Sequence, residues 1–284
     1  MKVTRGQTVL LTGATGGLGA VIAQRFAREG VNLALAAFPG VDLEALRATV
    51  ERAGAKAGAW VADLRDAGER QRLLAGVRQS LGDVDILINN AGVEFTSAYH
   101  HLTAENLQDI LRINLEAPME LTRLLLPGML ARRRGHIVNI SSLAGKSGPA
   151  FQEPYAATKA ALVAFTASLR ASYRNSGVSA SVVVPGFVEA GIYASLKARS
   201  GCSAPLLLGT SKPERVADAV LAVIESDCPE KLINPVPVRP MLALSALWPR
   251  LGEWITEQTG ANDFFRRVVG KLQPAPAEAT KKHS

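Results

Sequence analysis

A glycine-rich turn follows directly on the first apolar run of the chain. Val9, Leu10 and Leu11 form that run, and Thr12-Gly13-Ala14-Thr15-Gly16-Gly17-Leu18-Gly19 follows it. Glycine permits positive φ and lets a ligand approach the backbone, because no Cβ is in the way. An amphipathic helical pattern over 18–28 comes next, and its first turn would present unpaired N–H groups to an anion. Strand, turn and helix together predict a site for a nucleotide diphosphate; a glycine turn alone would reflect only backbone geometry.

Short apolar runs alternate with helical patterns along the chain. The expected strands are 8–11, 32–36, 58–61, 84–88, 136–140, 179–184 and 231–233, and the expected helices are 18–28, 42–53, 67–80, 103–130 with a break near Pro118, 155–175 and 213–225. Continuous apolar strands suit a parallel sheet that is buried on both faces. With right-handed crossovers, this pattern predicts an α/β fold, a Rossmann-type doubly wound seven-stranded parallel sheet with helices on both faces and ligands at the carboxyl ends of its strands.

The composition fits one large globular domain of an enzyme. The 284 residues are 48% hydrophobic and 20% charged, so neither a disordered chain nor a membrane bundle is expected. No run is long enough to span a bilayer, residues 1–6 lack the apolar stretch of a signal peptide, and Cys202 and Cys228 have no metal-site spacing. We therefore expect a cytoplasmic protein with free thiols and no metal.

The net charge of +7 is concentrated in part at Arg132-Arg133-Arg134. These arginines lie where a helix should end, and cations there complement the helix dipole. No basic stripe is interleaved with aromatic residues, so a nucleic-acid partner is not expected.

A second group of residues indicates proton-transfer chemistry. Tyr155 and Lys159 stand four positions apart in a helical pattern and share one face. A nearby ammonium would lower the phenol pKa from about 10 and make the tyrosine a usable general acid/base. The alternative is a core tyrosine beside a surface lysine. Ser142 favours the catalytic interpretation, because it follows the strand 136–140 at its carboxyl end and could bind a substrate carbonyl; Ser141 is the neighbouring candidate, and either serine could merely cap the loop.

Taken jointly, these motifs resemble the short-chain dehydrogenase/reductase family over about residues 7–233. Thr12-Gly13-xxx-Gly17-x-Gly19, Asn89-Asn90-Ala91-Gly92, Asn114, Ser142 and Tyr155-xxx-Lys159 occur in that family's order and spacing. The separation between Ser142 and Tyr155 matches, which selects Ser142 over Ser141. The resemblance implies an NAD(P)-dependent oxidoreductase.

The resemblance also implies a role for each residue. Tyr155 would exchange a proton with the substrate oxygen, Lys159 would bind the nicotinamide ribose, Ser142 would polarise the carbonyl, and Asn114 would hold a water that relays protons. Asp63 would bind the adenine amino group, or else cap the next helix, and Asn114 could be an ordinary helix residue bonded to backbone. The residues expected to contact the cofactor are Gly13, Thr15, Gly16, Gly17, Leu18, Gly19, Ala37, Phe38, Asp63, Leu64, Asn90, Ala91, Gly92, Tyr155, Lys159, Pro185, Gly186 and Val188.

Two departures from the family pattern bear on the cofactor. Ala190 stands where a threonine often binds the carboxamide. The second strand ends in Ala36-Ala37-Phe38-Pro39, with neither the acidic residue that favours NAD nor an arginine that favours NADP. Because no carboxylate would repel a 2′-phosphate and the chain is basic, NADP is slightly favoured over NAD.

The chain divides into a nucleotide-binding and catalytic domain at 1–233, an apolar extension at 234–272 and a tail at 273–284 that is expected to be disordered. Large apolar residues of the extension recur at helical spacing: Leu242, Leu244, Leu247, Trp248, Leu251, Trp254 and Ile255. Such a helix could pack on its own domain, cover the substrate pocket, join subunits or contact a lipid surface.

The substrate is expected to be an apolar carbonyl compound or alcohol, such as a steroid, acyl chain, other lipid or polyketide. A substrate lobe is placed at 189–212, pocket walls are expected at Phe95, Phe151, Gln152 and Tyr193, and His100 and His101 are expected on the surface. We expect a homodimer or homotetramer. The alternatives are a non-redox lyase or epimerase and a non-catalytic nucleotide-binding scaffold, which would have lost the glycine turn, the lysine or the Ser/Tyr/Lys set.

Overall fold

The computed structural model describes residues 1–272, and the predicted tail at 273–284 lies outside the described residues. Seven parallel strands form one sheet in the order β3-β2-β1-β4-β5-β6-β7. Their bounds are β1 Thr8–Thr12, β2 Asn32–Ala37, β3 Lys56–Val61, β4 Ile86–Asn89, β5 Gly135–Ile140, β6 Val178–Pro185 and β7 Glu230–Ile233. The strand order reverses between β1 and β4, so the chain leaves a crevice at the carboxyl ends of these strands. The predicted doubly wound fold is confirmed.

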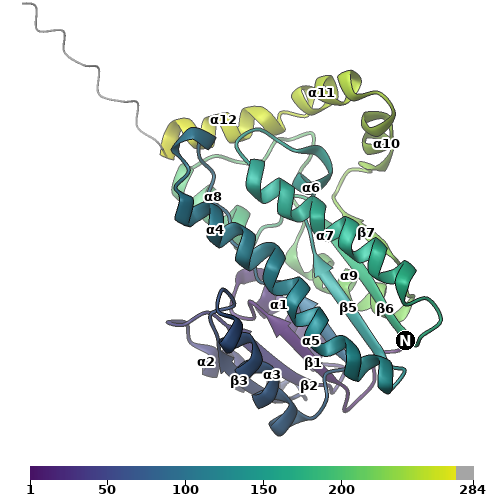
Figure 1. Cartoon of the computed structure of the whole chain (residues 1–284). Coiled ribbons are helices and arrows are strands. Elements are labelled where there is room, and N and C mark those ends of the chain that lie inside the picture. Colours follow the sequence, from purple (N-terminus) through teal and green to yellow (C-terminus); the bar gives the residue numbers. More distant parts are fainter. Residues whose placement is uncertain (273–284) are drawn as a thin grey trace, which may run out of the picture.

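Two layers of helices bury the sheet. One layer consists of α1 (Gly17–Ala27), α2 (Leu43–Arg52) and α9 (Pro213–Glu225), and the other of α3 (Ala67–Leu81), α5 (Ala117–Ala131) and α7 (Glu153–Ser172), which lie in front of the sheet in Figure 1. Side chains of β1 alternate between the layers: Val9 and Leu11 pack against the first, and Leu10 against the second. Both faces are therefore apolar, as the unbroken apolar strands predict.

The helical pattern over 103–130 is divided by a π-helical segment. Helix α4 (Ala104–Leu111) leads into the π-helical residues Arg112–Glu116, and α5 follows. The break therefore comes before Pro118, which stands in the first turn of α5, where a missing N–H costs no hydrogen bond. The segment matters because it carries Asn114.

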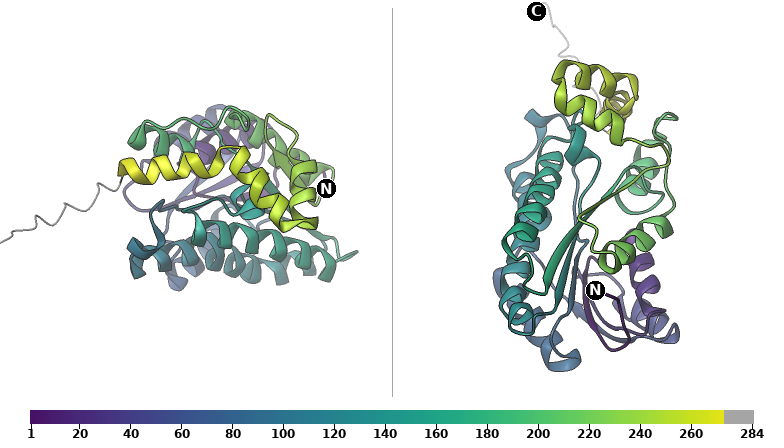
Figure 2. Two further views of the ribbon diagram at one scale, coloured as in Figure 1. Left: turned by 90° about the horizontal axis from the view of Figure 1, so that it is seen from above. Right: turned by 90° about the vertical axis from the view of Figure 1, so that its right-hand side faces the viewer.

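The extension forms three helices rather than one continuous stripe: α10 (Arg239–Leu247), α11 (Pro249–Gln258) and α12 (Ala261–Leu272). Trp248 is extended, with φ −132° and ψ 90°, because the following Pro249 disfavours the helical conformation there. Figure 2 shows the three helices as a cap over the carboxyl end of the sheet. Leu247, Trp248 and Trp254 are 68%, 56% and 60% exposed, so this part of the extension does not pack on its own domain.

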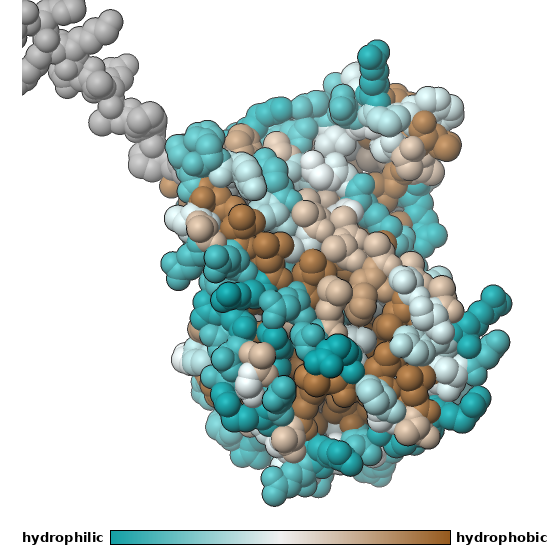
Figure 3. Space-filling view, viewed as in Figure 1, coloured by the Kyte–Doolittle hydropathy of each residue, from teal (hydrophilic) through white to brown (hydrophobic). Residues whose placement is uncertain are grey.

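The front face of the molecule carries further apolar side chains. Figure 3 shows them gathered over α4, α5 and α7. Leu111 of α4 and Met119 of α5 are each 42% exposed. Within residues 1–272, no helix combines the length and apolar character needed to cross a bilayer.

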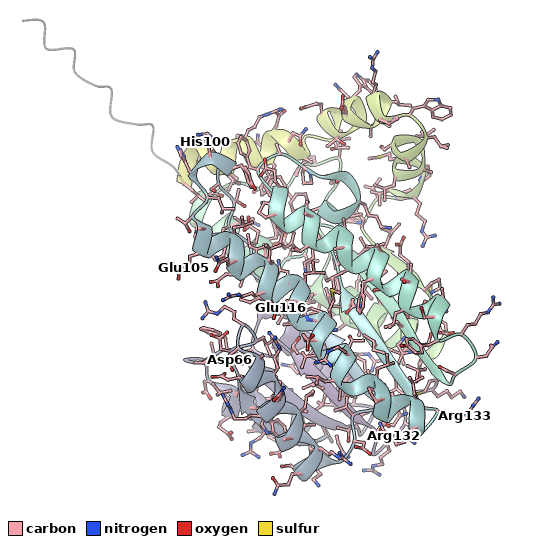
Figure 4. All side chains as sticks on the ribbon, in the orientation of Figure 1. Asp66, His100, Glu105, Glu116, Arg132 and Arg133 are labelled. Atoms are coloured by element: carbon pink, nitrogen blue, oxygen red, sulfur yellow. The ribbon has the colours of Figure 1, made fainter. Side chains whose placement is uncertain are left out.

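The three arginines at 132–134 act at the end of α5, as Figure 4 shows for Arg132 and Arg133. Arg132 donates to Val84 O at 2.9 Å, Arg133 to Asn175 O at 3.3 Å, and Arg134 pairs with Asp85 at 2.7 Å. They fasten the helix end to neighbouring loops, which favours the prediction of a helix terminus.

Candidate active site

A cavity of about 680 Å³ opens at the carboxyl ends of the strands. It brings together the glycine turn, the ends of β2 and β3, the loop after β4, and Ser142, Tyr155 and Lys159. All catalytic and cofactor-contact residues predicted from the sequence line it except Asn114, which is buried behind it. Residues that are far apart in the chain thus meet at one site, as the doubly wound topology requires.

The glycine turn forms a tight cradle. Gly13 adopts φ +64°, and Gly16 N donates to Gly13 O at 3.1 Å. A Cβ on Gly19 would overlap Gly13 O, and one on Gly17 would lie 2.7 Å from the Gly191 amide nitrogen. The first amides of α1 have no intrahelical partner and point at the space over the turn. The turn therefore fits a diphosphate, which would accept hydrogen bonds from backbone N–H groups.

Asn90 fixes the turn to the centre of the sheet. Its Nδ2 donates to Thr12 O at 3.0 Å and to Gly13 O at 3.1 Å, while the Thr12 hydroxyl accepts from the amides of Asn90 and Ala91 at 3.1 Å each. A Cβ on Gly13 would lie 2.8 Å from Ala91 Cα, so the two segments touch. Asn90 is therefore a structural support of the cradle as well as part of its lining.

The end that would receive adenosine contains an arginine that sequence analysis missed. The Arg65 guanidinium lies 5.3 Å from the centre of the Phe38 ring and pairs with Asp63 at 2.7 Å and Asp109 at 2.9 Å. The hydrogen bonds from Arg65 lower the pKa of Asp63. Asp63 does not cap the next helix, because Asp66 occupies that position and accepts from Glu69 N at 2.7 Å. The only sequence signal for Arg65 is its place two residues after Asp63.

The catalytic candidates lie on two neighbouring elements. Ser142 follows β5 and faces the cavity, whereas Ser141 is buried and donates its hydroxyl to Lys159 O at 2.7 Å. Ser142 Oγ accepts from Ala144 N at 3.2 Å, and Ser142 lines the cavity together with Tyr155, whose pKa it lowers. The prediction of Ser142 rather than Ser141 thus agrees with the geometry, since Ser141 is committed to holding α7 against the strand.

Tyr155 and Lys159 share the buried face of α7. Lys159 Nζ lies 5.6 Å from the centre of the Tyr155 ring and donates to Ile140 O at 2.9 Å. Burial raises the pKa of Tyr155, the Ser142 hydrogen bond lowers it, and the charge of Glu94 raises it further. Burial also lowers the pKa of Lys159 to about 8. The expectation that Lys159 lowers the pKa of Tyr155 is therefore wrong for this structure, because desolvation acts on both groups and dominates.

Asn114 supports the site from behind. Its Oδ1 accepts from Val93 N at 2.8 Å, and its Nδ2 donates to Val93 O at 2.9 Å and to Thr158 Oγ1 at 3.4 Å. The π-helical segment turns this side chain away from its own helix and onto the loop after β4. A Cβ on Gly92 would lie 3.4 Å from both Asn114 Oδ1 and Lys159 Nζ, so these two groups flank the same glycine.

Pro185, Gly186 and Val188 pass along the cavity after β6. Ala190, at the start of α8 (Gly191–Ser200), lines the cavity with a methyl group where the family pattern has a hydroxyl. No side-chain donor to a carboxamide is therefore present at this position.

The substrate side is apolar with one polar wall. Phe95, Gln152 and Tyr193 line the cavity as predicted, but Phe151 does not: it has φ +61° and packs against the cluster of Tyr193 and Phe264. From α12, Ala261 and Phe265 reach the cavity, so the last part of the extension covers it. The polar wall contains Glu94, which sequence analysis missed. His100 is exposed at the outer edge of Figure 4, and its ring meets that of His101 edge-on, with the ring centres 4.2 Å apart.

Comparisons with known proteins agree with this geometry. The model of the short chain dehydrogenase family matches residues 7–201. The chain is 38% identical to the ketoacyl reductase HetN of Nostoc sp. over 272 residues, covering 94% of each protein. It is 30% identical to the 3-oxoacyl-[acyl-carrier-protein] reductase FabG of Thermotoga maritima, over 76% of this chain and 89% of that one.

Solved structures of short-chain oxidoreductases superpose on this fold. A variant of the actinorhodin polyketide ketoreductase with NADPH superposes with a TM-score of 0.74 at 30% identity, over 80% of this chain and 95% of that one. A metagenomic short-chain oxidoreductase in complex with NADP superposes with a TM-score of 0.68 at 31% identity, over 83% of this chain and 100% of that one.

Proposed function

The chain belongs to the short-chain dehydrogenase/reductase family of NAD(P)-dependent oxidoreductases, and on that premise we propose that it interconverts a ketone and a secondary alcohol on an apolar, acyl-chain-like substrate. One observation carries the proposal: Ser142, Tyr155 and Lys159 face the same cavity as a glycine cradle that fits a diphosphate. An intact set of this kind favours redox chemistry over a lyase, an epimerase or a non-catalytic scaffold.

The residues around the cavity would hold the cofactor along its length. The amides of Gly17 to Gly19 would bind the diphosphate, Asp63 and Leu64 would contact the adenine end, and Lys159 and Val188 would contact the nicotinamide half; all of them line the cavity. When bound, the cofactor supplies or accepts the hydride. Side chains and backbone groups of this chain would bind and orient the substrate and transfer the proton.

Proton transfer is assigned to Tyr155. In reduction, Ser142 Oγ–H would donate a hydrogen bond to the substrate carbonyl, and Tyr155 would donate its hydroxyl proton to the same oxygen as negative charge develops there. Because burial raises the pKa of Tyr155, the hydroxyl keeps its proton at neutral pH, as an acid must. Asn114 would hold the loop at Val93 and, through the second lone pair of its Oδ1, a water beside Lys159.

NADP(H) is proposed as the preferred cofactor. Arg65 lies against Phe38 at the end of β2, where a 2′-phosphate would be recognised, and no side chain at Ala37 or Phe38 would repel it. Two carboxylates already pair with Arg65, so we infer a modest rather than an absolute preference. The solved neighbours contain NADPH or NADP, which agrees with this proposal.

An acyl-chain-like substrate is favoured by the apolar lining that Phe95, Leu196 and Phe265 provide, and by relatives named as ketoacyl reductases. We further propose that a second copy of the chain covers the apolar front face at Leu111 and Met119 in a homodimer or homotetramer. The exposed tryptophans of the extension remain available for a subunit or lipid contact.

Replacement of Tyr155 tests the mechanism. Tyr155→Phe removes only the hydroxyl, so ketone reduction should fall about 10²- to 10⁴-fold while the Kd of NADPH changes little. Turnover is followed at the nicotinamide absorbance with a panel of ketones and alcohols, and Tyr99→Phe, an exposed tyrosine, is the matched control. A Tyr155→Phe enzyme that keeps near-wild-type rates on a good substrate contradicts the assignment.

A further inference from the structure

Glu94 introduces a carboxyl group into the apolar side of the cavity. It follows β4 in the loop that begins with Asn90, and it lines the cavity together with Tyr155, Gln152 and Arg199. Acidic side chains are rarely buried without partners, because leaving water is costly for their charged form. Neither the fold nor the proton transfer described above requires a carboxyl group here.

Neighbouring side chains hold Glu94 in one orientation. Its Oε1 accepts hydrogen bonds from Thr96 Oγ1 and from Gln152 Nε2, the latter at 2.8 Å. Gln152 Nε2 also lies 2.8 Å from Thr96 Oγ1 and 3.2 Å from Phe151 O, and both Thr96 and Gln152 are buried. Oε1 is therefore fully engaged. In the described part of the chain, no group bonds the second oxygen, Oε2, of this cavity-lining residue.

The surroundings shift the protonation equilibrium of the Glu94 carboxyl group towards its neutral form. Burial raises the pKa of Glu94, while the hydrogen bonds from Thr96 and Gln152 and the charge of Arg199 lower it less. A protonated Glu94 can donate from Oε2 and an ionised one can accept there, so the residue suits an oxygen-bearing group in either state.

The cluster is close to the reacting centre. Gln152 is the N-cap residue of α7, three residues before Tyr155 in the sequence. Glu94, Gln152 and Tyr155 line the same cavity, and the charge of Glu94 raises the pKa of Tyr155. One substrate in this cavity could therefore meet Glu94 with one oxygen and Ser142 and Tyr155 with another. A 3-oxo ester or thioester offers such a pair of oxygens, on the first and third carbons of one acyl chain.

We propose that Glu94, held by Thr96 and Gln152, binds a second oxygen of the substrate, so that the cavity selects 3-oxo esters or thioesters over simple ketones of the same chain length. This inference rests on the proposed ketone reduction and adds the class of substrate. The ester or thioester carbonyl would accept the Oε2–H of Glu94 while the 3-oxo group lies at Ser142 and Tyr155. The rest of the acyl chain would occupy the apolar lining near Phe265.

Two variants of the full chain and two substrates test the proposal. Glu94→Leu removes the polar group, whereas Glu94→Gln keeps its shape and a donor; Glu105→Leu, on the exposed side of α4, is the matched control. The substrates are a 3-oxo ester and a simple ketone of equal chain length. A hydrogen bond to a buried partner contributes roughly 1–2 kcal/mol, so Glu94→Leu should lower kcat/KM for the 3-oxo ester about 5- to 30-fold and change that for the ketone less than about 3-fold.

Glu94→Gln should keep most of the activity on the 3-oxo ester, and all variants should bind NADPH as the wild type does. If Glu94→Leu lowers kcat/KM equally for both substrates, or for neither, the assignment of Glu94 is overturned, and the proposed reduction stands. If the wild type reduces no ketone with either cofactor, the proposed function itself is contradicted. The two failures are therefore distinguishable.

Discussion

Gly19→Ala is the substitution that most directly tests the cofactor cradle. Gly19 is buried in the first turn of α1, and its backbone conformation is accessible to any residue, so the cost of a methyl group is purely steric. The added Cβ would overlap Gly13 O and lie 2.9 Å from Ala14 O, where ordinary contact begins at 3.4 Å. Because the overlap with Gly13 O is the larger one, the turn would have to open by about an ångström, which is enough to spoil the angles and distances of hydrogen bonds to a diphosphate.

The size of the effect follows from the hydrogen bonds that would be lost. Each charge-assisted bond contributes about 1.5–3 kcal/mol, so the loss of two raises the Kd of NADPH by roughly 10²- to 10⁴-fold. Calorimetric titration measures the Kd, and circular dichroism checks the fold. Gly16→Ala provides a graded comparison, because its Cβ would lie 3.3 Å from Gly13 O, and Gly270→Ala in α12 is the control with open space around it. A Gly19→Ala protein that binds NADPH within about 5-fold of the wild type would refute the steric argument.

Two further predictions concern charge. Arg65→Gln should weaken NADPH binding about 10- to 100-fold and NADH binding less than about 3-fold, because only NADPH carries the 2′-phosphate. Titration of both cofactors measures the two affinities, and Arg72→Gln, at an exposed arginine, is the control. Equal losses for the two cofactors would assign Arg65 a structural role. His136 is buried, with its Nε2 2.9 Å from Ser181 Oγ, and burial lowers its pKa from 6.5 to about 4. Between pH 4 and pH 6.5 the unfolded state therefore binds more protons than the folded state. The contribution of His136 to the free energy of unfolding should be complete above about pH 6.5 and should fall by about 3 kcal/mol towards pH 4. Urea unfolding from pH 4.5 to 7.5 should show a shallower pH dependence in His136→Gln, and parallel curves for the two proteins would exclude this histidine as the cause.

The sequence predicts the strands and the main catalytic candidates, because both leave local patterns in the chain. The apolar runs gave all the strands to within two residues, because burial on both faces leaves few polar positions in a parallel strand. Tyr155 and Lys159 could be selected because they share one helix face, and Ser142 because its separation from Tyr155 matches the family that the chain resembles. The directions of the pKa shifts of Tyr155 and Lys159 could not be predicted, because the spacing of two residues on a helix does not show how deeply the surrounding layers bury them.

The site residues that the sequence does not reveal, Arg65 and Glu94, share a different cause. Arg65 approaches Phe38 through the pairing of β2 with β3, and Glu94 meets Gln152 across 58 positions of the chain. Neither contact leaves a periodic or spaced pattern. The end of α10 at Trp248 was readable in principle from Pro249, but the apolar spacing across that proline suggested one helix. Tertiary proximity of single polar residues is thus the part of the site that one sequence does not reveal.

The position of Glu94 couples substrate recognition to proton transfer. Its negative charge raises the pKa of Tyr155, so an ionised Glu94 opposes formation of the phenolate that remains after Tyr155 has donated its proton. Interactions between titrating groups are reciprocal, and a phenolate at Tyr155 would in turn favour the protonated carboxyl group. A substrate carbonyl that accepts the Oε2–H of Glu94 stabilises that same protonated form. Binding of a second substrate oxygen would therefore hold Glu94 in the protonated form, which does not work against the acid, whereas a simple ketone offers no partner to Glu94.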